Sequence, residues 1–356
     1  MKIVQIVPEL KLAGAQIMVE SLSKELKKRG HDVVIISLYS IDTPITKRLT
    51  QSGIKVIFLE KKNGFDFKVI IKLHKLIKSI RPDIIHTHSY TLKYAYFATL
   101  SMHFKMIHTI HNIADKETTP ANLKFAKKLY RKKIVCPVAI SPTIKKSIAD
   151  YYGLDESTVP MIFNGIALNK CIVKDDYALH TPPQIIHIGR FQEQKNHSMI
   201  IDAMEKVCKV CPDVNLVLWG EGELKDELVQ KVRNLHLEKN VIFAGLTDDP
   251  YKELNQSDIF ILPSKWEGMP ITLIEAMASA LPCIVTSVGG IPDMVEDNVS
   301  GVISLTDSDD LSAKICKLLE DELMRKKIGI KALEKSTMFS DVIMCDRYLD
   351  VYEHWS

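Results

Sequence analysis

The sequence has no long apolar run: no stretch approaches the ~18–20 residues that a membrane-spanning helix needs. Its opening residues, MKIVQIVPEL, hold one Lys and only a brief apolar segment, which is typical of a first β-strand rather than a signal peptide. The seven cysteines are scattered, and the lone CxxC of Cys208 and Cys211 lacks the second pair that a zinc site requires. We therefore expect a cytoplasmic protein with reduced cysteines.

Glycine-rich nucleotide-binding loops are missing as well. No GxGxxG follows any strand-like segment, and WGEGEL (219–224) supplies Gly220 and Gly222 without a third glycine. No GxxxxGK[ST] occurs either. A nicotinamide- or flavin-binding Rossmann domain is therefore a weak interpretation, and the usual P-loop NTPase is excluded.

What the sequence does have is a β–α alternation that occurs twice. Short apolar runs alternate with helix-like segments such as AQIMVESLSKELKKRG (15–30), which predicts parallel sheets covered by helices on both faces. The predicted strands form two sets: residues 2–8, 32–39, 55–60, 83–88, 105–112 and 137–141, then 184–190, 214–220, 241–245, 258–263, 282–287 and 301–304.

The length of 356 residues favours two domains. We predict an N-terminal acceptor-binding domain at 1–175 and a C-terminal donor-binding domain at 176–340. Residues 341–356 are predicted as a helix that packs back on the N-terminal domain. The aperiodic segment 173–184, which contains Pro182–Pro183, is the predicted linker. Two doubly wound α/β domains facing a central cleft would bind ligands at the carboxyl ends of their strands.

Charge divides the chain in the same way. Residues 1–175 carry 29 Lys and Arg against 14 Asp and Glu, whereas the remainder carries 18 against 30. Opposite signs in the two halves indicate different partners. The basic half should be drawn to something anionic, such as a membrane surface, a phosphate or nucleic acid.

The segment IHIGRFQEQKNH (186–197) places two cations after a buried strand. Gly189 lets the backbone approach a ligand closely, and Arg190 and Lys195 follow in the loop. Both cations are suited to a diphosphate, Arg190 as a fork and Lys195 as a point charge. Taken alone, the segment is better explained by two solvated loop charges.

The segment WEGMPITLIEAMASALP (266–282) places two glutamates eight positions apart. Pro270 suits a first helical position, so the N–H groups of Ile271 and Thr272 form a candidate anion site. Glu275 would then accept hydrogen bonds from hydroxyls beyond the phosphates, such as a ribose diol, and Glu267 from hydroxyls on the other side. Helix electrostatics alone would account for Glu275 but not for Glu267. A sugar–diphosphate–nucleoside has this layout.

Three segments together, GRFQEQKNH (189–197), residues 263–301 from PSKWEGMP to DNVSG, and PELKLAGAQIMVESLSKELKKRGHDV (8–33), resemble the family-four retaining glycosyltransferases of the GT-B fold. The resemblance runs through nearly the whole chain in the expected order. It implies a nucleotide-sugar donor held mainly by the C-terminal domain, and transfer that needs no cofactor and no metal ion.

The resemblance also implies a role for individual residues. Glu267 is expected at the sugar hydroxyls as a catalytic residue, Glu275 at the ribose, and Arg190 with Lys195 at the diphosphate. The amides of Ile271 and Thr272 are expected at a phosphate, and those of Gly268 and Met269 near the sugar.

In the N-terminal half, the resemblance places Gly14 near the donor phosphates, although the glycine that precedes it in the family is Ala13 here. His111 corresponds to a histidine that reaches the donor sugar near its reacting carbon, as the second catalytic residue. A lone histidine beside a strand is more often structural. His86 and His88 near a neighbouring strand end weaken that alternative.

The chemistry expected is a front-face displacement with retention at the anomeric carbon. Arg190, Lys195 and a helix N-terminus can stabilise the charge that grows on the leaving nucleoside diphosphate. The acidic clusters DSDD (307–310) and DDP (248–250) are interpreted as solvated turns rather than metal sites.

The acceptor is inferred only from charge. KFAKKLYRKK (124–133) holds six basic residues with Phe125, Leu129 and Tyr130 interleaved, which favours an amphipathic helix on anionic lipid headgroups as much as a solvated surface helix. We therefore expect a peripheral enzyme on the inner face of the plasma membrane. It would extend a saccharide or lipid-linked saccharide for capsule, exopolysaccharide or lipopolysaccharide. Nucleic acid is disfavoured because no motif accompanies the charge.

Three alternatives remain from the sequence. The protein could be a nucleotide-sugar epimerase of the same fold, or a non-catalytic sugar-nucleotide sensor. A dehydrogenase is a third, weaker possibility. The nucleotide is expected to be UDP.

Overall fold

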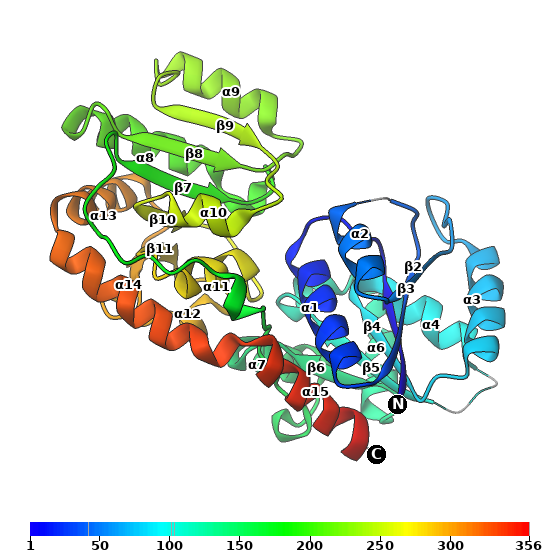
Figure 1. Ribbon diagram of the computed structural model, residues 1–356. Helices are drawn as coiled ribbons and strands as arrows, with labels where there is room; N and C mark the ends of the chain where they lie inside the picture. The colour runs from blue at the N-terminus through cyan, green and yellow to red at the C-terminus, as the bar shows by residue number, and fades with distance from the viewer. Residues whose placement is uncertain (42, 101, 103, 356) are drawn as a thin grey trace. The chain divides into compact units, whose positions relative to one another are not determined.

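The computed structural model describes residues 1–41, 43–100, 102 and 104–355; residues 42, 101, 103 and 356, which fall in the predicted N-terminal domain and C-terminal segment, lie outside it. The chain divides into two compact units (Figure 1). The first comprises Met1–Ile166 together with Phe339–Ser356, and the second comprises Ala167–Met338.

The first unit is built on a six-stranded parallel sheet of order β3-β2-β1-β4-β5-β6. Its strands are rich in Val and Ile, which suit a pleated surface that is buried on both sides. The strand order reverses between β1 and β4. The strands are β1 Lys2–Val7, β2 Asp32–Ser37, β3 Lys55–Phe58, β4 Ile84–His88, β5 Lys105–Ile110 and β6 Cys136–Ala139, and the helices are α1 Gly14–Lys28, α2 Pro44–Gln51, α3 Phe67–Ile80, α4 Leu92–Ala98, α5 Ala114–Glu117, α6 Pro120–Arg131, α7 Pro142–Tyr152 and α15 Asp341–His354.

The second unit repeats this plan with a six-stranded parallel sheet of order β12-β11-β10-β7-β8-β9. Here the strand order reverses between β7 and β10. The strands are β7 Gln184–Ile188, β8 Asn215–Trp219, β9 Val241–Gly245, β10 Ile259–Leu262, β11 Cys283–Thr286 and β12 Val302–Ser304, and the helices are α8 His197–Val210, α9 Lys225–Asn234, α10 Pro250–Asn255, α11 Ile271–Ala278, α12 Ile291–Met294, α13 Ser308–Glu320 and α14 Glu322–Ser336.

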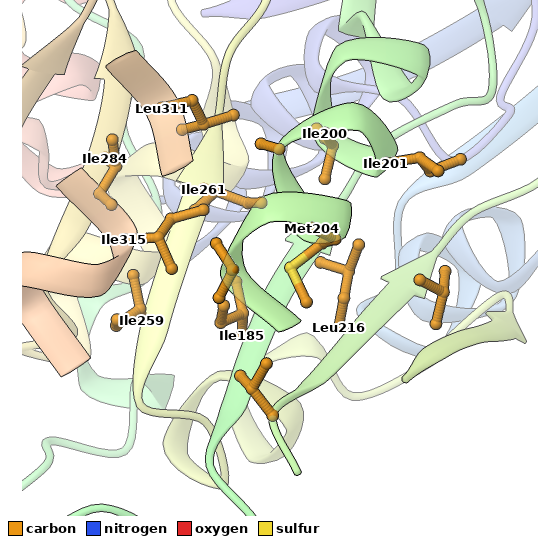
Figure 2. Packing of buried hydrophobic residues seen from close by; sticks show 14 of the residues in the cluster. Ile185, Ile200, Ile201, Met204, Leu216, Ile259, Ile261, Ile284, Leu311 and Ile315 are labelled. Atoms are coloured by element: carbon orange, nitrogen blue, oxygen red, sulfur yellow. The ribbon is translucent and has the colours of Figure 1, made fainter. Parts of the chain in front are cut away.

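An aliphatic core holds β7 and β10 of the second unit in place (Figure 2). Ile185 on β7 and Ile261 on β10 pack with Met204 of α8 and Ile315 of α13, all fully buried. Such close-packed apolar side chains fix the two strands rigidly. The loops that leave the carboxyl ends of β7 and β10 therefore start from well-defined positions.

The chain passes between the units at 166/167 and 338/339, not within the predicted linker. Residues 173–184 belong wholly to the second unit. The buried Lys174 donates a hydrogen bond from Nζ to the carbonyl of Ser257 at 3.0 Å, and Tyr177 donates from its hydroxyl to the carbonyl of Ala280 at 3.0 Å. Hydrogen bonds from isolated side chains attach residues 173–184 to the second unit. Such contacts leave no hydrophobic periodicity in the sequence, so the sequence could not predict them.

The last helix, α15, belongs to the first unit. Arg29 at the end of α1 forms an ion pair with Asp346 and donates a hydrogen bond to the carbonyl of Val342 at 3.2 Å. In the core of the unit, Tyr352 Oη lies 2.7 Å from His86 Nδ1. All twelve strands predicted from the sequence are present, each within about two residues of its expected start.

Candidate functional site

The predicted donor-site residues of the second unit follow two adjacent strands. β7 is followed by Gly189 and the 3-10 turn Glu193–Lys195, and β10 by the loop that leads to α11. β7 and β10 pair in parallel where the strand order reverses, and open α/β sheets bind ligands at that point. The sheet topology therefore brings both loops together at the carboxyl ends of β7 and β10.

Glu267 and Lys195 form an ion pair that joins the loop after β10 to the loop after β7. Lys195 Nζ lies 2.6 Å from Glu267 Oε1, and Glu267 is only 4 % exposed. Ser264 donates a hydrogen bond from Oγ to the same carboxylate oxygen at 2.7 Å, and Gln194 donates from Nε2 to Oε2 at 3.2 Å. Three donors fix the carboxylate in one orientation, as a group that positions a ligand should be.

A glycine pair supports the backbone on the other side of Glu267. Gly289 has a φ of +56°, and a Cβ atom there would collide with the carbonyl of Glu267. The N–H of Gly290 donates to the carbonyl of Gly268 at 2.9 Å. The buried residues Gly268 and Met269, predicted to lie near the sugar, follow directly in this supported segment.

Helix α11 starts at Ile271, one residue later than predicted, and Pro270 occupies the N-cap position rather than the first helical position. Pro270 has no side-chain hydrogen-bond acceptor, so the N–H groups of Ile271 and Thr272 are left to other partners. Glu275 lies in the second turn and is buried. Burial, with the nearby Glu275 carboxylate, raises the pKa of the Cys171 thiol to about 12.

Arg190 is the exposed member of the predicted set. It follows Gly189, where a Cβ atom would come within 2.8 Å of His187 Nε2 and 3.3 Å of Lys195 Cγ. The side chain of Arg190 makes no hydrogen bond or ion pair within the described residues. It is therefore free to move, unlike Lys195.

Gly220 and Gly222, which suggest an incomplete nucleotide-binding motif in the sequence, have a packing role. A Cβ atom at Gly220 would collide with the carbonyl of Gly189, and one at Gly222 with the carbonyl of Phe191. The N–H of Phe191 donates to the carbonyl of Glu221 at 3.0 Å. These glycines let the loop after β8 support the loop that carries Arg190.

In the first unit, Gly14 opens helix α1 and Ala13 is its N-cap. Ala13 has φ −152° and ψ 158°, an extended conformation that any residue adopts without strain. Its carbonyl accepts hydrogen bonds from the N–H groups of Gln16 and Ile17 at 3.0 Å. The alanine that departs from the family pattern is thus compatible with this loop.

His111 follows β5 and is held through its ring and its backbone. Its Nε2 lies 3.0 Å from His88 Nδ1, and its N–H donates to Glu117 Oε2 at 2.5 Å. The same Glu117 oxygen accepts from the N–H of Asn112 at 2.8 Å. The buried Nδ1 of His111 has no hydrogen-bond partner among the described residues. One ring nitrogen is thus positioned, and the other is buried without a hydrogen-bond partner among the described residues.

A hydrogen-bonded relay determines which nitrogen of His111 carries the proton. Gln5 Oε1 lies 2.7 Å from His88 Nε2, so His88 Nε2 carries a proton and donates it. Burial lowers the pKa of His88 well below its ordinary value and that of His111 to about 4, so both rings are neutral. His88 Nδ1 must then accept from His111 Nε2–H. The unpartnered Nδ1 of His111 is left as a hydrogen-bond acceptor.

Several residues of the site could not be identified from the sequence. Gln194 and Ser264, which orient Glu267, are ordinary polar loop residues by pattern. Gln5 and Glu117 act on His88 and His111 from segments without a motif. Gly289–Gly290 is the one pair with a visible signal, since adjacent glycines after a strand indicate close backbone approach.

The acidic clusters cap helices. Asp307 accepts hydrogen bonds from the N–H groups of Asp309 and Asp310 at the start of α13, and Asp249 caps α10. Within the part of the chain that the structure describes, no three His, Cys, Asp or Glu side chains are grouped to hold a metal ion.

The basic segment 124–133 differs from its predicted arrangement. Leu129 and Tyr130 are buried in the first unit, 2 % and 4 % exposed, because they form the inner face of α6. Phe125 stacks on Phe97 of α4 with ring centroids 5.6 Å apart. The apolar side chains of this segment therefore pack against protein, and its exposed face is basic.

Two family descriptions match the chain, one to each half. "Glycosyltransferase Family 4" matches residues 12–170, and "Glycosyl transferases group 1" matches residues 173–335.

Among curated proteins, the chain is similar to the UDP-Gal:alpha-D-GlcNAc-diphosphoundecaprenol alpha-1,3-galactosyltransferase of Escherichia coli. The two are 28% identical over 281 residues, which cover 73% of this chain and 72% of that protein. It is also similar to the N-acetyl-alpha-D-glucosaminyl L-malate synthase of Bacillus anthracis, at 26% identity over 352 residues, covering 91% and 89%.

Among solved structures, Anabaena HepE in complex with UDP-glucose matches with a TM-score of 0.86 and 21% identity over 99% of both chains. At this identity the match concerns the fold alone. No helix of the described residues is both long and apolar enough to cross a bilayer.

Proposed function

Because the chain belongs to the family-four glycosyltransferases of the GT-B fold, we propose that it transfers a sugar, with retention, from a nucleotide-sugar to a saccharide acceptor. The observation that carries this proposal is the buried Glu267, held by Lys195, Gln194 and Ser264 beside the start of α11. A fixed carboxylate next to a cation and a helix start without a side-chain cap suits a ligand that combines hydroxyls with phosphates.

In the proposed reaction, the bond between the anomeric carbon and the diphosphate oxygen breaks while the acceptor hydroxyl oxygen bonds to the same face of that carbon. The acceptor proton passes to the departing phosphate oxygen. Arg190, Lys195 and the amides of Ile271 and Thr272 would stabilise the charge on the leaving group. With these groups in place, we propose a reaction that uses no metal ion and no cofactor.

Glu267 would accept hydrogen bonds from the donor sugar and Glu275 from the ribose, with the amides of Gly268 and Met269 near the sugar. His111 would accept a hydrogen bond from a sugar hydroxyl through Nδ1, since that nitrogen is unpartnered among the described residues and without a proton. Gly14 would lie near the donor phosphates.

We propose UDP as the nucleotide and a lipid-linked saccharide as the acceptor, in the assembly of a cell-surface polysaccharide. Two names support this: the relative from Escherichia coli is described as using UDP-Gal and a diphosphoundecaprenol acceptor, and the HepE structure contains UDP-glucose. Such an acceptor would place the enzyme at the cytoplasmic face of the plasma membrane, where the basic first unit would meet anionic lipid.

A panel of UDP-, GDP- and ADP-sugars tests the donor. UDP-sugars should raise the melting temperature of the wild type, and GDP- and ADP-sugars should do so much less. Labelled donor with membrane extract should then yield a labelled lipid-linked product. An epimerase would instead change the donor sugar without any acceptor, and a sensor would do neither.

Glu267→Ala tests the site. We expect a loss of transfer of about hundredfold or more, because a fixed group that contacts the reacting sugar is removed. Glu322→Ala, which removes a carboxylate from the first turn of α14, is the matched control. Near-wild-type transfer by a folded Glu267→Ala protein would show that the site is wrongly assigned.

A further inference from the structure

Five large apolar side chains are exposed on one region of the first unit. Phe65 precedes α3, Phe67 and Ile71 lie on α3, and Phe97 and Leu100 lie at the end of α4. Phe67 is 64 % and Leu100 63 % exposed. We name these five residues the α3–α4 apolar patch. Exposed apolar groups that gather in one region mark an interaction site, whereas scattered ones do not.

Contacts join the two helices that carry the patch. The ring of Phe65 stacks on Tyr94 of α4 with centroids 5.6 Å apart, and His74 Nδ1 of α3 lies 2.8 Å from the carbonyl of Ala98. Phe67 and Ile71 are four residues apart and share one helical face. That face is exposed, because the buried residues of α3, Val69, Ile70, Leu73 and Ile77, lie on another side of the helix.

Helix α6 extends this surface. Phe97 stacks on Phe125 of α6 with centroids 5.6 Å apart, and Tyr96 meets the same ring edge-on at 5.3 Å. Together α3, α4 and α6 contain nine Lys or Arg residues and no Asp or Glu. Lys93 Nζ lies 5.2 Å from the centre of the Phe65 ring, so cations and apolar groups are interleaved.

We propose that the α3–α4 apolar patch, with the cations of α3, α4 and α6 around it, is a docking surface for an anionic lipid bilayer. Protruding Phe, Ile and Leu side chains would enter the interface between headgroups and acyl chains. The surrounding lysines would bind lipid phosphates, with each cation near the surface contributing about 1 kcal/mol. The sequence places lipid contact on α6 alone. In the structure, Leu129 and Tyr130 of α6 are buried, so the exposed apolar side chains available for lipid are those of the α3–α4 apolar patch.

Charge argues against the other occupants of this surface. A second copy of the chain packed face to face would oppose nine cations with nine cations, which is unfavourable in a symmetric dimer. Nucleic acid would satisfy the cations but would leave Phe67, Ile71 and Leu100 without apolar partners. An anionic bilayer satisfies both kinds of group.

Lipid docking by this surface is a property separate from the proposed sugar transfer, and it can be tested without measuring transfer. Wild-type protein is mixed with phosphatidylcholine vesicles, with or without phosphatidylglycerol, and the bound fraction is measured by sedimentation. We expect binding only to the anionic vesicles, weakened by salt. Phe67→Ser combined with Ile71→Ser should reduce the partition coefficient about tenfold or more, since two inserted side chains are lost.

The matched control is Leu323→Ser, which removes an 80 % exposed leucine from α14 in the second unit and should bind vesicles as the wild type does. A direct measure of insertion compares Phe67→Trp with Leu323→Trp. Only the Phe67→Trp protein should show an added blue shift of fluorescence on anionic vesicles.

Unchanged binding by the Phe67→Ser and Ile71→Ser double variant, or equal binding of the wild type to neutral vesicles, would overturn the proposal. Concentration-dependent dimerisation that the double variant abolishes, without vesicle binding by the wild type, would assign the patch to self-association instead. Stabilisation by UDP-sugars is measured in parallel, so that loss of the donor site and loss of the lipid surface are distinguished.

Discussion

Burial decides the protonation state of the histidines that lie in β4 and β5 or directly after β5. It lowers the pKa of His108 to about 3 and of His111 to about 4, and that of His86 and His88 well below the ordinary value. These rings are therefore neutral at physiological pH. The ring of His111 therefore has one unpartnered nitrogen among the described residues and no positive charge.

Replacing His88 with Ala should slow turnover without weakening donor binding. The ring of His111 would lose the acceptor that holds its Nε2–H, so its orientation and tautomer would no longer be fixed. We expect kcat to fall about tenfold to hundredfold, with the donor KM nearly unchanged.

The control for this prediction is His354→Ala, which removes a histidine at the end of α15 whose Nδ1 lies 3.0 Å from the carbonyl oxygen of Asp350 in the same helix. Long-range ¹H–¹⁵N spectra of the His111 ring should show protonation at Nε2 in the wild type and a mixture of tautomers in His88→Ala. A Nδ1-protonated ring in the wild type would contradict the relay.

Glu117 should make the stability of the first unit fall as pH rises. Burial raises the pKa of its carboxyl to about 8, above the ordinary value of 4.5. Between these two values the folded protein binds a proton that the unfolded chain does not, so the free energy of unfolding decreases with pH across that window. Glu117→Gln should remove this decrease between pH 6 and 8, measured by urea unfolding. An identical slope in both proteins would exclude Glu117 as its origin.

At the scale of elements, the segments after β7 and β10 are held by backbone as much as by side chains. Gly289 packs directly on the carbonyl of Glu267, and Gly290 donates to the carbonyl of Gly268. The position of the Glu267 carboxylate therefore depends on a loop after β11 that contains no predicted site residue.

Gly289→Ala should weaken the binding of a UDP-sugar about tenfold or more. The added methyl group would collide with the Glu267 carbonyl and displace the segment that carries the carboxylate. Gly53→Ala is the matched control: Gly53 has φ +70° and nothing within 4 Å of an added Cβ, so it imposes the same backbone strain without the collision. Equal affinity in both variants, measured by calorimetry, would argue against the supporting role of Gly289.

Elements of the fold were more predictable than their contacts. Alternating apolar runs were sufficient for all twelve strands, since period and flanking residues are local properties. The same reasoning was wrong about the lipid-facing apolar residues of α6, because an amphipathic helix has the same pattern whether its apolar face meets lipid or core. The packing of Leu129 and Tyr130 depends on residues far away in the chain.

The candidate site was partly predictable for a related reason. Glu267, Lys195 and Glu275 could be proposed as site residues because they stand at fixed spacings beside a helix start. The ion pair between Glu267 and Lys195 joins segments 72 residues apart, and no local pattern encodes it. Gln194 and Ser264 depend on that pairing and were not predictable before it.

For the whole molecule, the free energy of unfolding should decrease as pH falls. The folded-state pKa values of His86, His88, His108, His111, His187 and His197 are all depressed by burial. Below about pH 6.5 the unfolded chain binds protons that the folded protein does not, so the free energy of unfolding decreases as pH falls. Each histidine can contribute up to roughly 1.4 kcal/mol per pH unit in that window.

Urea unfolding at pH 7.5, 6.5 and 5.5 tests this prediction. The midpoint should fall steeply between pH 6.5 and 5.5. His187→Phe should reduce the loss attributable to the second unit, whereas His236→Ala, which removes an exposed histidine, should leave the slope unchanged. A midpoint that stays constant down to pH 5.5 would contradict the assignment of these rings as neutral.

The return of α15 to the first unit bears on the order in which the protein becomes structured during synthesis. The second unit is one continuous stretch, Ala167–Met338, and can fold as soon as it leaves the ribosome. The first unit is made first but is interrupted, because Tyr348 and Tyr352, which contact Thr109 and His86, are among the last residues translated. The first unit, which carries His111, should therefore complete its folding last. A chain that ends before α15 should already bind a nucleotide but should not yet transfer a sugar.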